Sequence, residues 1–179
     1  MEDQEILEKF KNPDSRNWAF NQLVRKYQQK VYWHVRKMVI DHDEADDLTQ
    51  EVFIKVWKHL PDFRQDAQLY TWIYRIATNE CLNFLKSKKR RFFLPLNDIT
   101  EELSQKIDAN AGPDADEIQL KLQKALLKLP DKQRLVFNMR YYDELKYEEI
   151  AEILGTSVGA LKASYHHAVK KIEDFLTNT

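Results

Sequence analysis

The chain has few of the residues that interrupt helices or cross-link a fold. Its 179 residues include only three glycines, five prolines and one cysteine, while Leu, Ile, Lys, Glu and Gln are abundant. This composition predicts an all-α fold and argues against a sheet with many turns. A lone cysteine cannot form an internal disulfide, and the apolar spacing around Cys81 indicates a small core residue without a redox role.

Long apolar runs and targeting signals are also missing. No stretch is apolar for long enough to span a bilayer, and the acidic start MEDQEILEKF lacks the basic-then-apolar order of a signal peptide. We therefore expect a soluble, cytoplasmic protein with no membrane insertion. The sequence offers no glycine-rich phosphate loop, zinc-ligand spacing or convincing nucleophile–base pair, so we expect no catalytic activity and no cofactor.

Apolar residues at helical spacing divide the chain into two parts. They predict helices over residues 15–39, with Ser15 as the N-terminal cap, from within 41–61, and from about Leu69 to Lys89, and a second group of helices from Ile118 onward. Between these groups, residues 92–117 carry seven acidic side chains against one basic, with prolines and a glycine that break any long helix. We predict two small helical domains, residues 1–91 and 116–179, joined by a flexible acidic linker at residues 92–115.

The second domain ends in two amphipathic helices with a very short connection. Gly155 accepts the left-handed conformation that ends a helix, and Ser157 can cap the next helix start. So tight a connection predicts a helix-turn-helix whose second helix is exposed. From Ser157 to Lys171 the sequence holds no acidic residue. This charge pattern favours binding of duplex DNA by the second helix.

An acidic run, Asp41 to Asp47 with His42 inside it, raises the possibility of a metal site or a nuclease. A calcium loop needs a glycine at its sharp turn and a bidentate glutamate at its end, and this run instead leads directly into a helix. Acidic side chains at a helix N-terminus are stabilised by about 0.3–1 kcal/mol each. We therefore interpret the run as a helix start and predict no metal site.

The third predicted helix carries a mixed aromatic and polar face. Projected at about 100° per residue, one side holds Trp72, Arg75, Asn79, Asn83 and Lys86, and the helix ends in the basic run KSKKRR. Aromatic rings stack on unpaired bases, amides bond to base edges, and clustered cations hold phosphates. With Phe63 and Tyr70 nearby in sequence, this face predicts binding of single-stranded nucleic acid.

Two stretches of the sequence resemble a known protein family. The runs DLTQEVF and YTWIYRIATN, and the residues around them, resemble region 2 of extracytoplasmic-function (ECF) sigma factors of the sigma-70 family. The run YEEIAEIL and the helix pair around it resemble region 4 of the same proteins. The resemblance covers most of the chain and implies a sigma factor that binds core RNA polymerase and directs it to promoter DNA. The family commonly also has an anti-sigma partner.

The resemblance assigns a role to each surface. It implies core polymerase binding by Asp46, Asp47, Gln50, Glu51, Phe53 and Trp57. It implies recognition and melting of the minus-ten element by Phe63, Arg64, Tyr70, Trp72, Arg75, Asn79, Asn83, Lys86, Lys88, Lys89, Arg90 and Arg91. It implies minus-thirty-five recognition by Ser157, Lys162, Ala163, His166, His167 and Lys170. The sequence departs from many family members in placing Ser164, His167 and Val169 where arginine is common, which predicts a shallower salt dependence.

Two other functions are weighed against this interpretation. A stand-alone helix-turn-helix regulator would use only Tyr147 to Lys171 and would bind duplex DNA tightly without polymerase. A nuclease would use the acids of Asp41 to Asp47 and would require a metal ion. The sigma-factor hypothesis ranks first because it uses both predicted nucleic-acid surfaces and the tether between them.

Overall fold

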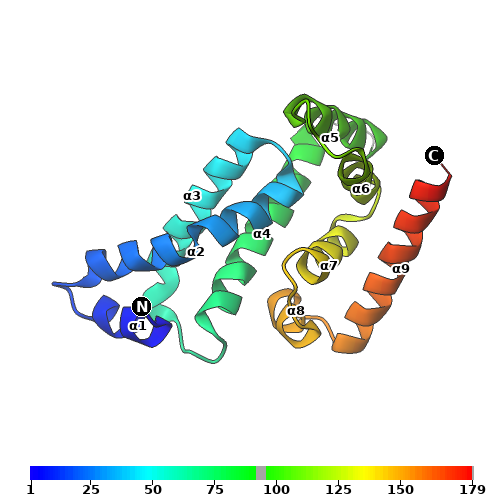
Figure 1. The fold of residues 1–179 in the computed structure, drawn as a ribbon. Coiled ribbons are helices and arrows are strands. Elements are labelled where there is room, and N and C mark those ends of the chain that lie inside the picture. The colour runs from blue at the N-terminus through cyan, green and yellow to red at the C-terminus, as the bar shows by residue number, and fades with distance from the viewer. Residues whose placement is uncertain (92–95, 179) are drawn as a thin grey trace.

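The computed structural model describes residues 1–91 and 96–178, with the backbone alone described at residue 91 and residues 96–99. All regular structure in these residues is helical, which confirms the predicted all-α fold (Figure 1). The elements are α1 (Asp3–Lys11), α2 (Arg16–Val39), α3 (His42–His59), the 3-10 turn η1 (Leu60–Asp62), α4 (Leu69–Arg91), α5 (Leu96–Asn110), α6 (Glu117–Leu127), α7 (Asp131–Tyr141), α8 (Tyr147–Leu154) and α9 (Val158–Thr177). No helix of the described residues has the length and apolar character needed to cross a membrane.

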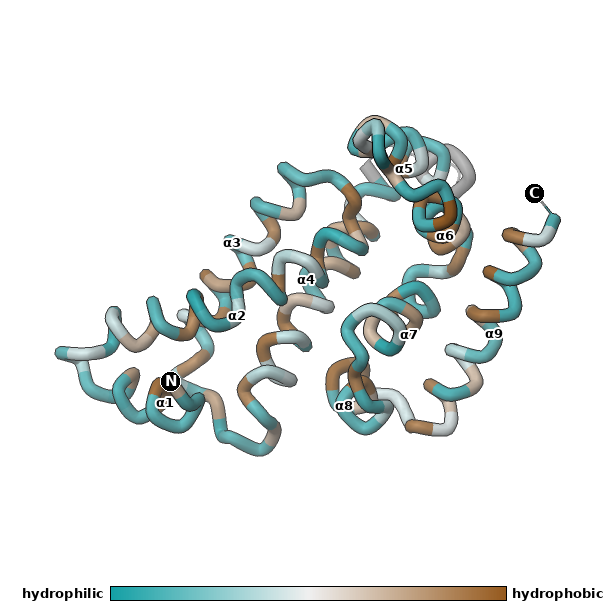
Figure 2. Tube along the Cα trace, viewed as in Figure 1, coloured by the Kyte–Doolittle hydropathy of each residue, from teal (hydrophilic) through white to brown (hydrophobic). Residues whose placement is uncertain are grey.

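Helices α1 to α4 form an N-terminal unit around one apolar core. Val31 and Val35 of α2, Val52 of α3 and Ile73 and Ala77 of α4 are all fully buried in it. In Figure 2 hydrophobic and hydrophilic segments alternate along these helices, as expected where each helix buries one side. Full burial of a Val or Ile side chain is worth about 1.5–3 kcal/mol, so these apolar positions hold the helices in place.

The helix starts of this unit show one prediction confirmed and one wrong. At the start of α3 the Asp41 carboxylate accepts a hydrogen bond from the Glu44 backbone N–H at 3.0 Å, as the helix-start interpretation requires. That bond lowers the pKa of Asp41 below its usual value, and the neighbouring Lys106 adds to the effect. Ser15 occupies the predicted cap position of α2, but its hydroxyl instead donates to the Lys9 carbonyl at 2.7 Å.

Helices α6 to α9 form the C-terminal unit, and its last two helices are the predicted helix-turn-helix. Gly155 ends α8 in the left-handed conformation, with φ at 65°, and its N–H donates to the Ala151 carbonyl at 2.8 Å. Ser157 then caps α9 by accepting from the Ala160 N–H at 3.2 Å. The two residues act as predicted from the sequence.

The segment predicted as an irregular linker contains a helix of 15 residues, α5. Gly112 and Pro113, two of the predicted helix breakers, follow this helix, and the third, Pro95, is outside the described residues. Leu103 and Ile107, four residues apart, are buried against Leu127 of α6. The prediction that no long helix forms here was therefore wrong, because an apolar face outweighed the surrounding acidic charge.

The two units are packed against each other. Leu135 and Met139 of α7 and Ile150 of α8 are fully buried and belong to the same apolar cluster as the core of the N-terminal unit. Helix α8 packs against α4 (Figure 1), and α7 packs against α2. The described chain is thus in a closed arrangement.

A pair of glycine substitutions tests the geometry of the helix-turn-helix. Neither Gly155 nor Gly159 has an atom within 4 Å of an added Cβ, so both changes act through backbone conformation alone. We expect Gly155→Ala, at positive φ, to lower the free energy of unfolding by about 1 kcal/mol, and Gly159→Ala, inside α9, to raise it by about 0.5–1 kcal/mol. Urea denaturation followed by circular dichroism measures both, and midpoints that move in the same direction would contradict the assigned geometry.

Candidate nucleic-acid and polymerase-binding surfaces

Helix α4 has the two faces that the sequence predicts. Arg75, Asn79, Asn83 and Lys86 are exposed and Trp72 is partly exposed, while Ile73, Ala77 and Cys81 are buried on the opposite side. We call the first set the α4 polar face. Burial raises the pKa of the Cys81 thiol to about 12, so this thiol stays protonated at neutral pH. The structure agrees with the interpretation of Cys81 as a core residue.

Aromatic rings border the N-terminal end of the α4 polar face. Phe63 follows η1, and its ring lies 5.0 Å from that of Trp72 between centroids, at a tilt of 41°. Tyr70 packs against Tyr74 at 4.7 Å, and burial raises the pKa of both phenols. Arg64, in the preceding loop, is exposed. The loop and the helix together present aromatic surface beside a cation, which suits stacking on an unpaired base.

The basic end of α4 is only partly available. Lys86 and Arg90 are exposed, whereas Lys88 is 8% exposed and Lys89 forms an ion pair with Asp131 of α7 at 2.8 Å. The side chain of Arg91 is outside the described residues. Two of the five predicted cations are therefore engaged by protein groups in the closed arrangement.

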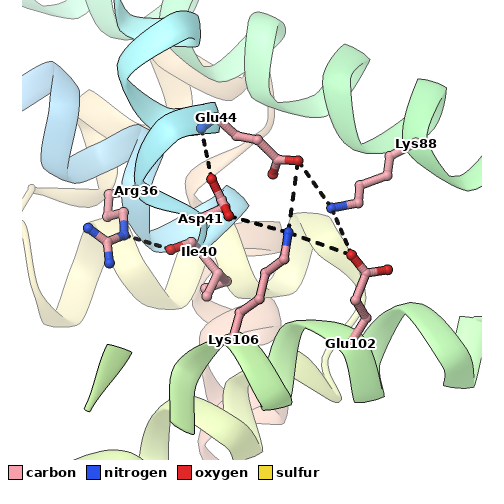
Figure 3. Close-up of polar contacts among 7 residues, drawn as sticks. All are labelled: Arg36, Ile40, Asp41, Glu44, Lys88, Glu102 and Lys106. Atoms are coloured by element: carbon pink, nitrogen blue, oxygen red, sulfur yellow. Dashed lines mark hydrogen bonds and ion pairs between the residues drawn. The ribbon is translucent and has the colours of Figure 1, made fainter. Parts of the chain in front are cut away.

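Lys88 belongs to a polar cluster that attaches α5 to the N-terminal unit (Figure 3). Its ammonium lies 3.4 Å from Glu44 of α3 and 3.5 Å from Glu102 of α5. Lys106 of α5 lies 3.5 Å from Asp41 and 3.6 Å from Glu102. Burial lowers the pKa of Lys106, but Glu44 and Asp41 outweigh it and the net pKa is raised. A helix in the predicted linker thus bonds to both the start of α3 and the end of α4.

Helix α3 presents the predicted polymerase-binding face. Asp46, Asp47, Gln50 and Glu51 are exposed, and Trp57 is 38% exposed. The Trp57 ring meets the rings of Phe10 and Phe20 edge to face, with centroids 5.5 and 5.0 Å away.

The exposure of two apolar residues of α3 differs from what the sequence predicts for a polymerase-binding face. Phe53 is 7% exposed and belongs to the core, so it supports the face from below and offers little surface to a partner. Ile54, which the sequence analysis did not select, is 59% exposed beside it. The spacing of Ile54 three residues before Trp57 is the signal that could have identified it.

Helix α9 exposes the face predicted for duplex DNA. Lys162, Ala163, His166, His167 and Lys170 are all exposed, as is Ser157 at the helix start. The opposite side buries Leu161, Ala168 and Ile172. The first acidic residues of α9 are Glu173 and Asp174, near its C-terminal end. The exposed face of the helix is therefore basic or neutral as far as Lys171, and carboxylates appear on it only near the C-terminal end.

Within the described part of the chain, one group of His and Asp side chains lies close enough together to contact a single metal ion. Ligand atoms of His42, Asp43 and Asp46 lie within 4.8 Å of one another at the start of α3. His42 Nε2 lies 3.4 Å from Asp46, and its ring also contacts Tyr32. Helix-start chemistry accounts for these exposed acids without an ion.

Polar contacts between the N-terminal and C-terminal units involve the α4 polar face. The Arg75 guanidinium of the α4 polar face donates to the Glu152 carbonyl of α8 at 2.8 Å. Lys37 of α2 pairs with Asp143, in the α7–α8 connection, at 2.6 Å, and His34 Nδ1 lies 3.8 Å from the same carboxylate. The C-terminal unit therefore covers part of the surface that is predicted to bind single-stranded DNA.

An all-α fold whose last two helices form a helix-turn-helix is typical of DNA-binding proteins. Residues 23–91 match the family described as Sigma-70 region 2, and residues 119–172 match Sigma-70, region 4. The chain belongs to the extracytoplasmic-function (ECF) sigma factors of the sigma-70 family. It is a sigma factor that directs promoter-specific transcription initiation, and the stand-alone regulator is not favoured.

The similarity to individual relatives covers most of the chain. It is 33% identical to the RNA polymerase sigma-H factor of Pseudomonas aeruginosa, over 98% of this chain and 94% of that protein. It is 36% identical to the ECF sigma factor SigW of Bacillus subtilis, over 83% of each. It is 32% identical to the ECF sigma-E factor of Escherichia coli, over 97% and 94%.

Solved structures share the fold at low sequence identity. The sigma factor RpoE from Bartonella quintana, solved in complex with the anti-sigma factor NepR, superposes with a TM-score of 0.68 at 20% identity, covering 88% of this chain and 96% of that one. CnrH, solved in complex with the cytosolic domain of CnrY, gives 0.71 at 22%, covering 98% and 97%. These similarities agree with the all-α arrangement in two units.

The Lys37–Asp143 pair predicts that acid loosens the closed arrangement. Burial raises the pKa of Asp143, but His34 and Lys37 of the other unit outweigh it and hold the pKa below its usual value. A depressed carboxyl pKa contributes stability above the unfolded pKa of about 4 and loses it as pH falls through the folded pKa. Asp143→Asn should remove this dependence and weaken docking by roughly 1–3 kcal/mol.

Small-angle X-ray scattering between about pH 3 and pH 6 measures this effect. The radius of gyration should rise in acid for the parent chain and should be larger at neutral pH for Asp143→Asn. Asp3→Asn is the matched control, because it removes a carboxylate that pairs with another α2 lysine, Lys26, at 2.7 Å inside one unit. An Asp143→Asn protein as compact as this control would show that the pair does not hold the units together.

Proposed function

We propose that the chain binds core RNA polymerase and reads two promoter elements, with residues 1–91 as the region 2 domain, 92–115 as the linker and 116–179 as the region 4 domain. The α3 face is the proposed polymerase contact, through Asp46, Asp47, Gln50, Glu51 and Trp57, with Phe53 as its support. Exposed charge around a half-exposed tryptophan is typical of a protein-binding surface. The protein acts by binding and has no proposed catalytic step.

The α4 polar face is the proposed site for the minus-ten element. A base flipped from the non-template strand would stack beside Trp72 and Phe63, and Asn79 would bond to an exposed base edge. Flipping costs a few kcal/mol per base, and stacking can return about 1–3 kcal/mol of it, so capture favours strand separation. Lys86 and Arg90 would hold the adjoining phosphates.

Helix α9 is the proposed reader of the minus-thirty-five element. A helix whose exposed face is free of carboxylates over its first part, here Val158 to Lys171, can enter the major groove, and Lys162, His166 and His167 lie on that face. Because few of these side chains are permanently charged, the affinity should fall less steeply with salt than that of an arginine-rich helix.

The observation that supports this function is that the α4 polar face lies within residues 23–91, matched to region 2, and the exposed face of α9 within residues 119–172, matched to region 4. In the closed arrangement Arg75 is held by Glu152, and Lys89 by Asp131. Both side chains must leave these partners before they contact DNA. We therefore propose that polymerase and promoter binding proceed with separation of the two units.

Reconstituted transcription tests the function. Mixed with core polymerase and fragmented genomic DNA, the parent chain should give run-off transcripts from promoters that share a two-block upstream motif. Trp72→Ala should retain polymerase binding but reduce transcript yield by about 5- to 150-fold, as expected for loss of roughly 1–3 kcal/mol of stacking. Trp18→Ala is the matched control, because it removes an exposed tryptophan of α2 that belongs to none of the proposed polymerase-binding and DNA-binding surfaces.

Two outcomes of this assay would contradict the proposal in different ways. Failure to bind core polymerase would favour a DNA-binding role without it. Binding with full transcription by Trp72→Ala would retain the sigma activity but remove this side chain from promoter melting.

We also propose an anti-sigma partner, since two proteins of the same fold were solved in complex with anti-sigma factors or the cytosolic domain of another protein. Affinity purification of the tagged chain from its native host should yield such a protein besides polymerase. Added back in pure form, this protein should suppress the run-off transcripts of the reconstituted system. Repeated isolation of polymerase alone, or a co-purified protein that leaves transcription unchanged, would count against the partner.

A further inference from the structure

A cavity of about 470 Å³ lies where the two units and the linker helix meet. It is lined by Trp33, Arg36 and Lys37 of α2, by Ile40 just after that helix, by Ile107 and Asn110 of α5, by the connection that contains Ala115, and by residues of α6 and α7. Its volume falls within the range of about 300–1,000 Å³ that is typical of small-molecule sites. Because α2 and α7 belong to different units, this cavity exists only in the closed arrangement.

The lining of the cavity is apolar and positively charged. Ile40, Ile107, Leu126 and Leu127 supply apolar surface, and Trp33, which is 51% exposed, shows that the cavity reaches solvent on the α2 side. Among the residues that the structure describes, three cationic side chains, Arg36, Lys37 and Arg134, and no carboxylate line it. Such a lining fits a ligand that has an apolar body and an anionic group.

The neighbouring acids compensate for these cations incompletely. Lys37 pairs with Asp143, just outside the lining. Arg36 is held by neutral groups, donating to the Ile40 carbonyl at 2.6 Å (Figure 3) and to the Tyr32 hydroxyl at 3.0 Å. A positive charge therefore remains at the α2 wall.

Arg134 of α7 is the most unusual residue of the cavity. It is 3% exposed, and its Nε and Nη1 atoms are buried without a hydrogen-bond partner among the described residues. Its ion-pair contact, Asp131 at 3.7 Å, is shared with Lys89. Asn138, one turn further along α7, is 2% exposed, and its Oδ1 also lacks a donor.

Burial lowers the pKa of Arg134, and Asp131 only partly opposes the change. A guanidinium nonetheless stays charged in proteins, because even a lowered pKa remains far above neutral. A buried arginine with unused donors is a costly feature unless an acceptor reaches it. A carboxylate matches this geometry, because it can accept two parallel N–H bonds from one guanidinium.

We propose that the cavity binds a small amphipathic carboxylate, which places its acid group at Arg134 and its apolar body against the leucine and isoleucine side chains. The bound molecule joins α2, α5 and α7, so it holds the two units and the linker helix in the closed arrangement. The site and its ligand class do not depend on the polymerase surfaces proposed above, and binding can be tested on the free chain.

Isothermal titration calorimetry with 2-naphthoate and 2-naphthamide tests the proposal, because the two probes differ only in the charge of the acid group. The full-length chain should bind 2-naphthoate at one site and at least about 10-fold more tightly than the amide, as a charge-assisted pair requires. Equal affinities for the two probes, or no binding of either, would overturn the proposal.

Three variants locate the site. Arg134→Met keeps the approximate volume and should abolish the preference for the acid over the amide. Ala115→Trp fills the cavity from the linker side and should abolish binding of both probes. Lys132→Met removes an exposed cation of the same helix that does not line the cavity, and it should bind 2-naphthoate like the parent chain.

Circular dichroism checks that each variant is folded. Since replacing a buried charge by an apolar side chain of similar size is often neutral, Arg134→Met is expected to fold. Undiminished 2-naphthoate binding by Ala115→Trp would overturn the assignment even if Arg134→Met were unstable. A loss of affinity in Lys132→Met as large as in Arg134→Met would also overturn it, since general surface charge would then explain the binding.

Discussion

The packing of α7 and α8 onto α2 and α4 is the constraint on which the rest of the structure depends. Ile150 of α8 and Leu135 of α7 are fully buried in the cluster that also holds Ile73 of α4. Separating the units would expose part of this surface to water at about 25 cal/mol per Å² of apolar area. An open arrangement is therefore favourable only when partners cover the same surface or supply comparable contacts. The closed chain needs no covalent link or bound group to explain its compactness.

Polar contacts at the edge of this packing use cations that are also proposed to bind DNA. In the closed chain Arg75 donates to the backbone carbonyl of Glu152, and Lys89 forms an ion pair with Asp131, both in the C-terminal unit. Partly exposed pairs of this kind add little stability but fix the relative position of the units. Because the same cations belong to the proposed minus-ten surface, closure and DNA binding compete for individual side chains. Under this proposal, promoter DNA and the C-terminal unit are alternative partners of one helix face.

The sequence allows prediction of features set by local spacing. The polar face of α4, the left-handed Gly155 and the Ser157 cap all follow from periodicity and backbone preference, and the structure has each of them. Features set by distant contacts were not predictable in this way. Lys88 looks like a free cation in the sequence but is bonded to Glu44 and Glu102, and α5 forms because Leu103 and Ile107 find apolar neighbours. No local signal indicates how two amphipathic units dock.

The buried charge of Arg134 opposes the apolar packing that closes the chain. Moving a guanidinium out of water costs several kcal/mol unless its donors are satisfied, and here Nε and Nη1 are not. The apolar contacts of α7 and α8 outweigh this cost in the closed chain, but the difference between the two states is smaller than the apolar surface alone would give. Small differences between states are what a ligand or partner can reverse. A side chain that destabilises the closed state therefore makes opening easier to control, while an anion at Arg134 would remove the penalty and act in the opposite direction.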